Sequence, residues 1–234
     1  MLAARDPFAG CEQRIERRPR KLPALAIVGA SYTAGVGPDN PALSWAADLV
    51  RHLRWDAVIY GVPGAGYVRT GTDRLGPMAR MLDLERLPGL APSLVIVQAG
   101  HDDSGVPVRV ERRQVTATID LIRAKTPDAQ IALLTVFASP NVKVPAALWR
   151  TDHAIVAAAL DADPRAIIMD PLTGHWKFQH AHDRLHPTAA GDRWIARKVA
   201  SILDDNGIDP VPSSVTTAAV ICDLGVQAGG GGDA

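Results

Sequence analysis

The length and composition of this chain, 234 residues of which 47% are hydrophobic and 21% charged, are those of one globular domain large enough to bury a substantial core. Its 25 basic and 25 acidic residues leave no net charge, which argues against capture of nucleic acid or of an anionic membrane by charge alone. No apolar run is long enough for a signal peptide or a transmembrane segment, so a cytoplasmic location is expected, with a secreted form whose leader is missing as the alternative.

The two ends of the chain differ in composition from its centre. Residues 1–22 are rich in charge and are interpreted as a solvated lead-in, the alternative being a contact with an acidic partner. Residues 209–234 finish in a run of glycines and are expected to form a flexible C-terminal tail. The cysteines, Cys11 and Cys222, fall in these two segments, so no disulfide framework is expected. The predicted catalytic domain is therefore 23–208.

Short apolar, often β-branched runs alternate with helical patterns along this domain. Several of the runs are continuously apolar, as expected for parallel strands that are covered on both faces. The expected strands are 24–28, 57–60, 94–98, 131–137 and 166–169.

The first helix is expected to begin at Asn40 and Pro41, a capping side chain followed by proline at the first helical position. Its predicted apolar face is formed by Leu43, Ala46, Ala47, Val50 and Leu53. Further helices are expected to begin at Pro77, Pro107, Pro145 and Thr188.

Five strands interleaved with helices predict a three-layer α/β/α sandwich around a parallel sheet. In such sheets ligands bind beyond the carboxyl ends of the strands, near the switch in strand order. Four polar or glycine-rich segments follow predicted strands and should converge on this edge: 29–35, 61–66, 100–103 and 183–186. This convergence predicts an active site there.

A serine, a histidine and an aspartate stand among these segments. A serine hydroxyl is a weak nucleophile until a neighbouring base takes its proton, and a carboxylate can fix that base in the required tautomer. Ser31 follows the first strand, and the spacing of Asp183 and His186 lets one loop turn bring carboxylate and imidazole together. The backbone N–H of Ser31 and that of Gly64 are candidate oxyanion donors, whereas Pro63 has no N–H to offer. These residues predict a serine hydrolase that acts on esters.

Two clusters raise a metal site as an alternative. The adjacent carboxylates Asp102 and Asp103 lack a convincing set of further acidic ligands. His175, His180 and His182 crowd the loop before the predicted triad, but without the spacing of metal ligands on a helix. They are expected to shape the cleft wall or to be solvated, and no metal or other cofactor is expected.

Taken together, the four segments resemble the SGNH hydrolases, the GDSL-type esterase/lipase superfamily, over about residues 24–204. The family has Gly-Asp-Ser, then a glycine after strand two, Gly-x-Asn-Asp after strand three, and Asp-x-x-His near the C-terminus. The matching segments in this chain are Gly29-Ala30-Ser31, 61–64, Gly100-His101-Asp102-Asp103 and 183–186. The resemblance implies a flavodoxin-like fold with a five-stranded parallel sheet.

The resemblance also implies roles for individual residues. Ser31 would be the nucleophile, His186 the general base and then acid, and Asp183 the residue that orients it. The oxyanion hole would be formed by the amides of Ser31 and Gly64 and by the side chain at position 102. The remaining residues of the third block, expected on the substrate-binding side, are Gly100, His101 and Asp103.

Two positions depart from the family pattern. Ala30 replaces an Asp that is not the nucleophile, so only local hydrogen bonding should change. Asp102 replaces the Asn whose amide donates to the oxyanion, and loss of one such donor typically costs about 10²–10³ in rate. Three outcomes stay open: a protonated Asp102 donates, His101 donates instead, or the chain is weakly active or non-catalytic.

The expected reaction is hydrolysis of a small acyl ester through a Ser-His-Asp triad and an acyl-enzyme. Acylated sugars and lysolipids are the candidate substrates, and low aromatic content without a long apolar lid favours short acyl groups. The alternatives are acyl transfer to an alcohol at the same site and a non-catalytic ligand-binding module. The sequence makes no prediction of oligomeric state.

Overall fold

A computed structural model describes residues 22–82, 90–140, 143–212 and 219–223 of the chain. Its centre is a parallel six-stranded sheet in the order β5-β4-β3-β1-β2-β6. The strands are β1 (Ala24–Gly29), β2 (Asp56–Gly61), β3 (Leu94–Gln98), β4 (Gln130–Leu134), β5 (Ile167–Met169) and β6 (Ala219–Asp223). The helices are α2 (Ser31–Ala34), α3 (Trp45–Leu53), α4 (Met78–Met81), α6 (Val108–Lys125), α7 (Ala146–Ala162) and α8 (Ala189–Asp204), with 3₁₀ turns η1 (Pro41–Leu43) and η2 (Thr72–Arg74).

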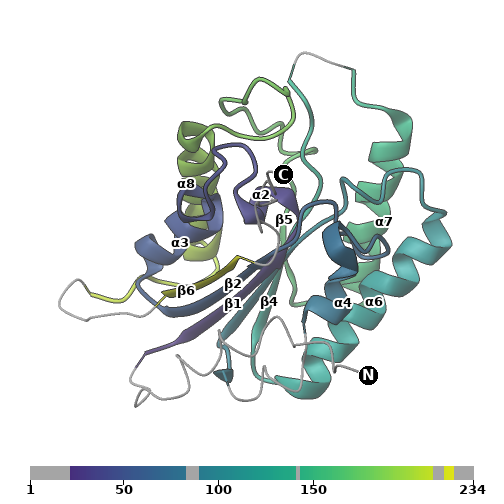
Figure 1. Ribbon diagram of the computed structural model, residues 1–234. Helices are drawn as coiled ribbons and strands as arrows, with labels where there is room; N and C mark the ends of the chain where they lie inside the picture. The colour runs from purple at the N-terminus through teal and green to yellow at the C-terminus, as the bar shows by residue number, and fades with distance from the viewer. Residues whose placement is uncertain (1–21, 83–89, 141–142, 213–218, 224–234) are drawn as a thin grey trace, which may run out of the picture.

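The sheet separates two layers of helices, so the predicted three-layer α/β/α sandwich is confirmed. Helices α3 and α8 lie on one side of the strands, and α6 and α7 lie on the other with the short α4 (Figure 1). Strand order runs outward in both directions from β1 and β3, as in flavodoxin-like folds. The switch point, where such folds bind ligands, therefore lies between β1 and β3.

The sequence of strand β1 is apolar without interruption because both of its faces are buried. Side chains of a strand alternate between the two faces of the sheet. Ala26 and Val28 join the core beneath α6 and α7, whereas Leu25 and Ile27 join the core beneath α3 and α8. All four are fully buried, because neither face of the sheet meets solvent.

Two boundaries, the end of β4 and the start of α3, differ from the sequence expectations. Strand β4 ends at Leu134, three residues before the expected end, although Val136 and Phe137 remain buried. Asn40 caps a 3₁₀ turn rather than the long helix, which begins after a second cap, Ser44. Leu43, expected on the buried face, consequently lies in the turn and is 39% exposed.

The C-terminal segment is not wholly a flexible tail, as the composition suggested. Residues 219–223 form β6, which pairs in parallel with β2 at the edge of the sheet. An edge strand satisfies backbone N–H and C=O groups that β2 would otherwise present to solvent. The charged lead-in up to residue 21, Cys11 within it, and the final glycine run lie outside the described residues.

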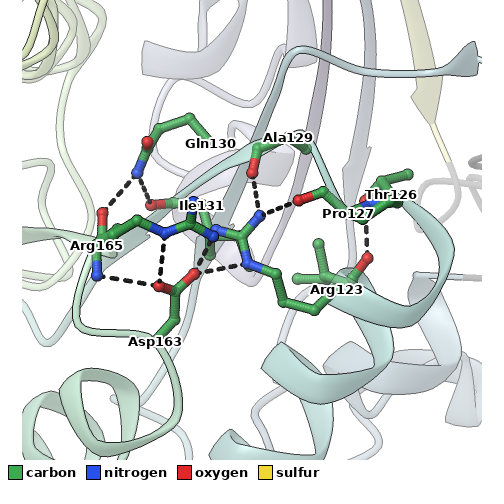
Figure 2. A network of polar contacts seen from close by, with 9 residues as sticks. Arg123, Thr126, Pro127, Ala129, Gln130, Ile131, Asp163 and Arg165 are labelled. Carbon is green, nitrogen blue, oxygen red and sulfur yellow. Dashed lines mark hydrogen bonds and ion pairs between the residues drawn. The ribbon is translucent and has the colours of Figure 1, made fainter.

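The amino-terminal edge of the sheet is fixed by a network around one arginine (Figure 2). The guanidinium of Arg123, at the end of α6, donates to the carboxylate of Asp163, which follows α7, and to the carbonyls of Pro127 and Ala129. Asp163 also accepts from the backbone N–H of Arg165 at 3.0 Å. The network joins the ends of α6 and α7 to the beginnings of β4 and β5.

Within the described part of the chain, no helix has the length and apolar character needed to cross a bilayer.

Candidate active site

Ser31, His186 and Asp183 form one hydrogen-bonded relay at the carboxyl-terminal edge of the sheet. The distance from Ser31 Oγ to His186 Nε2 is 2.8 Å, and that from His186 Nδ1 to Asp183 Oδ2 is 2.5 Å. An ionised carboxylate can only accept hydrogen bonds, so His186 Nδ1 carries a proton and donates a hydrogen bond to Asp183. In a neutral imidazole Nε2 is then the acceptor for the serine hydroxyl.

The loop that carries His186 is held in a closed turn. Asp183 Oδ1 accepts from the backbone N–H groups of Leu185 and His186 at 2.9 and 3.0 Å. Burial favours the neutral form of Asp183, but the hydrogen bonds from the His186 ring and from these two amides prevail and lower its pKa. The carboxylate is therefore ionised at neutral pH. The His186 side chain is 13% exposed, so it is shielded while Asp183 still meets solvent at 47%.

Ser31 is positioned by a buried glutamine at the end of the neighbouring strand. The backbone N–H of Ala30 donates to both the carbonyl and the side-chain oxygen of Gln98, each at 3.1 Å. The same side-chain oxygen accepts from the hydroxyl of Thr33 at 3.0 Å. These bonds attach the turn from β1 into α2 to the end of β3 and so fix the direction of the serine.

Tyr32 connects the serine turn to the histidine loop. Its hydroxyl donates to the carbonyl of Leu185 at 2.6 Å, and its ring stacks on Phe137 with centroids 4.2 Å apart. Burial, with the carboxylates of Asp183, Asp192 and Asp102 nearby, raises the pKa of Tyr32 far above its usual range. The phenol therefore keeps its proton and this bond to Leu185 at any pH the protein meets.

Two backbone N–H groups beside the serine are available for an oxyanion. Among the described residues, the N–H of Ser31 and that of Gly64 donate to no partner. Ser31 stands at the start of α2, where intrahelical acceptors are missing. Gly64 has φ +75°, a left-handed conformation that suits glycine, and it is partly exposed in the turn after β2.

Asp102, at the family's asparagine position, faces the same site. Asp102 is close enough to Tyr32 for its negative charge to raise the pKa of that phenol, and close enough to His186 for the imidazole to lower the pKa of Asp102. Burial raises the pKa of Asp102 and the adjacent Asp103 raises it further, while His101 and His186 act in the opposite direction. A raised pKa increases the fraction of Asp102 that carries a proton and can donate a hydrogen bond.

Asp103 does not line the substrate site, and this expectation from the sequence is wrong. Its side chain is fully buried, and its carboxylate accepts from the backbone N–H groups of Tyr67, Val68 and Arg69 at 2.6, 3.3 and 2.9 Å. A carboxylate so enclosed has no contact to offer a substrate. It instead fixes the segment that follows Gly64, and thereby the conformation of that candidate oxyanion donor.

Gly100 is likewise buried rather than presented to a substrate. It has φ +122°, and a Cβ there would lie 2.5 Å from Ile155 and 2.8 Å from Val136. Its role is to let the chain turn after β3 while α7 packs closely against it. Of the three residues expected on the substrate-binding side, His101 alone reaches a cavity; its Nδ1 lies 3.3 Å from the carbonyl oxygen of Phe137.

A second buried acid, Glu111 of α6, lies against Asp103. Burial and the negative charge of Asp103 raise the pKa of Glu111 to about 9. Three N–H groups stabilise an ionised Asp103, whereas neither oxygen of Glu111 has a hydrogen-bond partner at ordinary distance among the described residues. At neutral pH the pair therefore carries one charge, on Asp103, and one proton, on Glu111.

Two adjoining cavities border the loop that precedes α7. The larger, about 800 Å³, includes Trp149, Trp176, Phe178, His175 and His180 in its wall. The smaller, about 260 Å³, reaches His101 and shares Ser139, Lys143 and Val144 with the first. Of the loop histidines, His175 and His180 line the larger cavity, while His182 is exposed. In the described ranges no group of three or more His, Cys, Asp or Glu is arranged to hold a metal ion.

Sequence reasoning missed several residues that build this site. Gln98 could have been found as a polar side chain that ends an otherwise apolar strand. Tyr32 is adjacent to the predicted nucleophile, but nothing in the sequence indicates its bond to Leu185, 153 positions away. Trp176 and Phe178 are concentrated in the loop before Asp183, which is a signal for a lined cavity.

Comparison with known families matches residues 27–194 to the model described as "GDSL-like Lipase/Acylhydrolase family". Comparison with curated protein sequences returns no match. Among solved structures, a carbohydrate esterase family 2 enzyme with a carbohydrate-binding domain from Corynascus thermopiles (Myceliophthora fergusii) is similar, with TM-score 0.65 and 17% identity over 81% of this chain and 68% of that one.

Two further structures share the fold. A family 3 carbohydrate esterase from Clostridium thermocellum gives TM-score 0.61 and 17% identity over 80% of this chain and 97% of that one. A salicylyl-acyltransferase from a tetracycline biosynthetic pathway gives TM-score 0.62 and 18% identity over 83% of this chain and 58% of that one. At these identities the similarity establishes the fold.

Proposed function

The chain belongs to the GDSL-like lipase/acylhydrolase family, and we propose that it hydrolyses carboxylic esters through Ser31, His186 and Asp183. The observation that carries this proposal is the continuous relay from serine hydroxyl to imidazole to carboxylate, at 2.8 and 2.5 Å. Such a relay raises the nucleophilicity of a serine and holds its base in the required tautomer.

In the proposed first half-reaction, Ser31 Oγ attacks the ester carbonyl carbon while its proton passes to His186 Nε2. The imidazolium is stabilised by the ionised Asp183, and the carbonyl oxygen becomes an oxyanion. The unpartnered amides of Ser31 and Gly64 support a role as its donors. The tetrahedral intermediate collapses, the bond to the alcohol breaks, and the alcohol leaves with the proton from His186.

In the second half-reaction, a water molecule attacks the acyl-enzyme and gives its proton to His186. Collapse of the second intermediate releases the carboxylic acid and returns the proton to Ser31. The side chain at 102 adds a third donor only when it is protonated. We therefore propose an active enzyme whose rate is limited by ionised Asp102, rather than a non-catalytic module.

Substitution of the nucleophile tests the proposal. Ser31→Ala should lower the rate of hydrolysis of a short-chain 4-nitrophenyl ester by at least about 10⁴-fold. The substitution removes the nucleophile, and without it His186 and Asp183 have no hydroxyl to activate. Ser201→Ala, on the exposed side of α8, is the matched control and should leave the rate unchanged. Equal turnover by the Ser31→Ala variant and the unmodified chain would contradict the assignment.

Acyl transfer at the same site is the second candidate, supported by the similarity in fold to a salicylyl-acyltransferase. An acyl-enzyme can be attacked by an alcohol in place of water, and a cavity of about 800 Å³ beside the triad has room for one. Product analysis with a competing alcohol separates the two. A new ester as the major product would indicate a transferase, and free acid at all alcohol concentrations a hydrolase.

A further inference from the structure

The larger cavity beside the triad combines aromatic walls with positive charge. Trp149 of α7 and Trp176 and Phe178 of the loop before α8 contribute ring surfaces to its lining. Two lysines are also among the lining residues, Lys143 from the loop before α7 and Lys177 from the loop before α8. A space of about 800 Å³ is in the range that encloses a small organic molecule.

No carboxylate is found among the described residues that line this cavity. The nearest acids along its two loops are engaged elsewhere: Asp170 accepts from the N–H of Thr173 at 2.9 Å, and Asp183 holds His186. Burial lowers the pKa of His180, so this wall histidine is neutral at physiological pH. Among the described lining residues the two lysines therefore have no carboxylate partner. A negative charge on a ligand is the complement that they lack.

The cavity wall is continuous with the catalytic residues through packed rings. Phe178 meets Phe137 edge-on with ring centroids 5.6 Å apart, and Phe137 stacks on Tyr32, the residue after the nucleophile. His180 stacks on Phe178 with centroids 4.2 Å apart and forms a β-bridge with Pro187, the residue after the catalytic base. A ligand in the cavity is therefore held by the same loop that carries His186.

From this arrangement we propose that the cavity selects esters that carry an anionic group on a flat or apolar body. Lys143 and Lys177 bind the anion, and Trp149 and Trp176 contact the body while the ester carbonyl reaches Ser31. The proposal rests on the proposed ester hydrolysis and names the class of substrate. The two lysines are specificity-determining residues and take no part in the chemistry.

Matched pairs of esters test this selection. 4-Acetoxybenzoate and its methyl ester differ in a charge on the alcohol, and mono-4-nitrophenyl glutarate and its methyl ester differ in a charge on the acyl group. The kcat/KM of each ester is divided by its rate constant for hydrolysis by hydroxide, which corrects for intrinsic reactivity. The charged member of one pair should then have the higher value by about tenfold, which is the gain expected from two solvent-screened ion pairs. The pair that responds identifies which side of the ester the cavity holds.

Lysine variants connect the preference to the cavity. In Lys143→Met/Lys177→Met the charged-to-neutral ratio of kcat/KM should fall to near one, because neither ammonium group is left to attract the anion. Lys125→Met, at the opposite end of the sheet, is the matched control and should keep the full ratio. The preference should also decrease as salt rises from about 20 to about 500 mM, since the lysines are exposed enough to be screened.

A wild-type ratio of one or less for both pairs, or a ratio that the double variant retains, would overturn the proposal and leave ester hydrolysis standing. Should no ester be hydrolysed, the proposed function fails, and the cavity is tested by binding. Quenching of tryptophan fluorescence by 4-hydroxybenzoate and by its methyl ester then decides the matter. Tighter binding of the acid, lost in the double variant, supports the anionic site, and equal binding of the two overturns it.

Discussion

At each of the two edges of the sheet an aspartate is paired with a basic side chain, but the two pairs have different roles. At the amino-terminal edge Asp163 is paired with Arg123, and at the carboxyl-terminal edge Asp183 is paired with His186. In both places hydrogen bonds outweigh the effect of burial and lower the pKa of the carboxyl group. Both aspartates are therefore ionised, and the difference lies in the partner.

Arginine keeps its proton at every pH relevant to proteins, so the Asp163 network can only hold elements in place. Histidine exchanges its proton near neutrality, and His186 has a hydroxyl on its other nitrogen. An aspartate paired with a basic side chain therefore does not by itself indicate a catalytic role. Chemistry is indicated when the partner can give up its proton and a nucleophile lies within hydrogen-bonding distance of that partner.

Matched substitutions at the two aspartates should break the resemblance between the edges. Asp183→Asn should lower kcat about 10³–10⁴-fold, because an amide no longer fixes the His186 tautomer or stabilises the imidazolium. Asp163→Asn should leave kcat within about twofold but lower the free energy of unfolding by about 2–3 kcal/mol, since Arg123 loses its charged partner. Ester hydrolysis and urea denaturation of both variants measure this. The account fails if Asp163→Asn is the more damaging to kcat.

A change at Asp102 sharpens the comparison within the catalytic edge itself. Asp102→Asn restores an amide donor toward the oxyanion and should raise kcat by about 10-fold to 10²-fold at pH 8. Because the pKa of Asp102 is raised, lower pH protonates the wild-type side chain, and the ratio of variant to wild-type rate should then decrease.

The pH dependence of this rate ratio distinguishes an ionised carboxylate from a merely misplaced side chain. A ratio that stays constant between pH 5 and pH 8 would show that ionisation of Asp102 is not what limits the rate.

Asp103→Asn is the contrasting variant at the next position. It should lower activity and stability together, because three backbone N–H groups lose an ionised acceptor.

The last prediction concerns stability rather than rate, at Glu111 beneath the site. Its pKa is about 9 in the folded chain and near 4.5 when unfolded, so the folded state binds one more proton between these values. The free energy of unfolding therefore falls as pH rises through this interval, by about 1.4 kcal/mol per pH unit from this group. Glu111→Gln should remove that slope in urea denaturation at several pH values. Asp120→Asn, an exposed acid on the same helix, should retain it.

Much of the fold could be predicted because the sheet is buried on both faces. Continuous apolar runs marked β1 to β5, and Thr188 gave the correct start of α8. The sixth strand was missed because the glycine run that follows it suggested a tail, although residues 219–222 form an apolar run like those of the other strands. Leu43 was misassigned because helical spacing does not distinguish a 3₁₀ turn from a first helical turn.

The three residues of the hydrogen-bonded relay could be named from the sequence because the predicted chemistry demands particular residue types at the ends of strands. The surroundings could not, since they depend on contacts between distant segments. Asp103 looks like a cleft residue next to Asp102, but in the turn after β3 its side chain is buried against the backbone N–H groups of Tyr67 and Arg69. Tyr32, Gln98 and the two cavity lysines acquire meaning only when four loops are brought to one edge.

Covalent labelling tests the central claim most directly. A fluorophosphonate probe reacts with a serine only when a base has activated its hydroxyl and an oxyanion site is formed. The account predicts a single adduct, located by mass spectrometry on Ser31, that is lost in His186→Ala while the variant stays folded. Absence of labelling at Ser31 in the unmodified chain, or equal labelling in the His186→Ala variant, would contradict it.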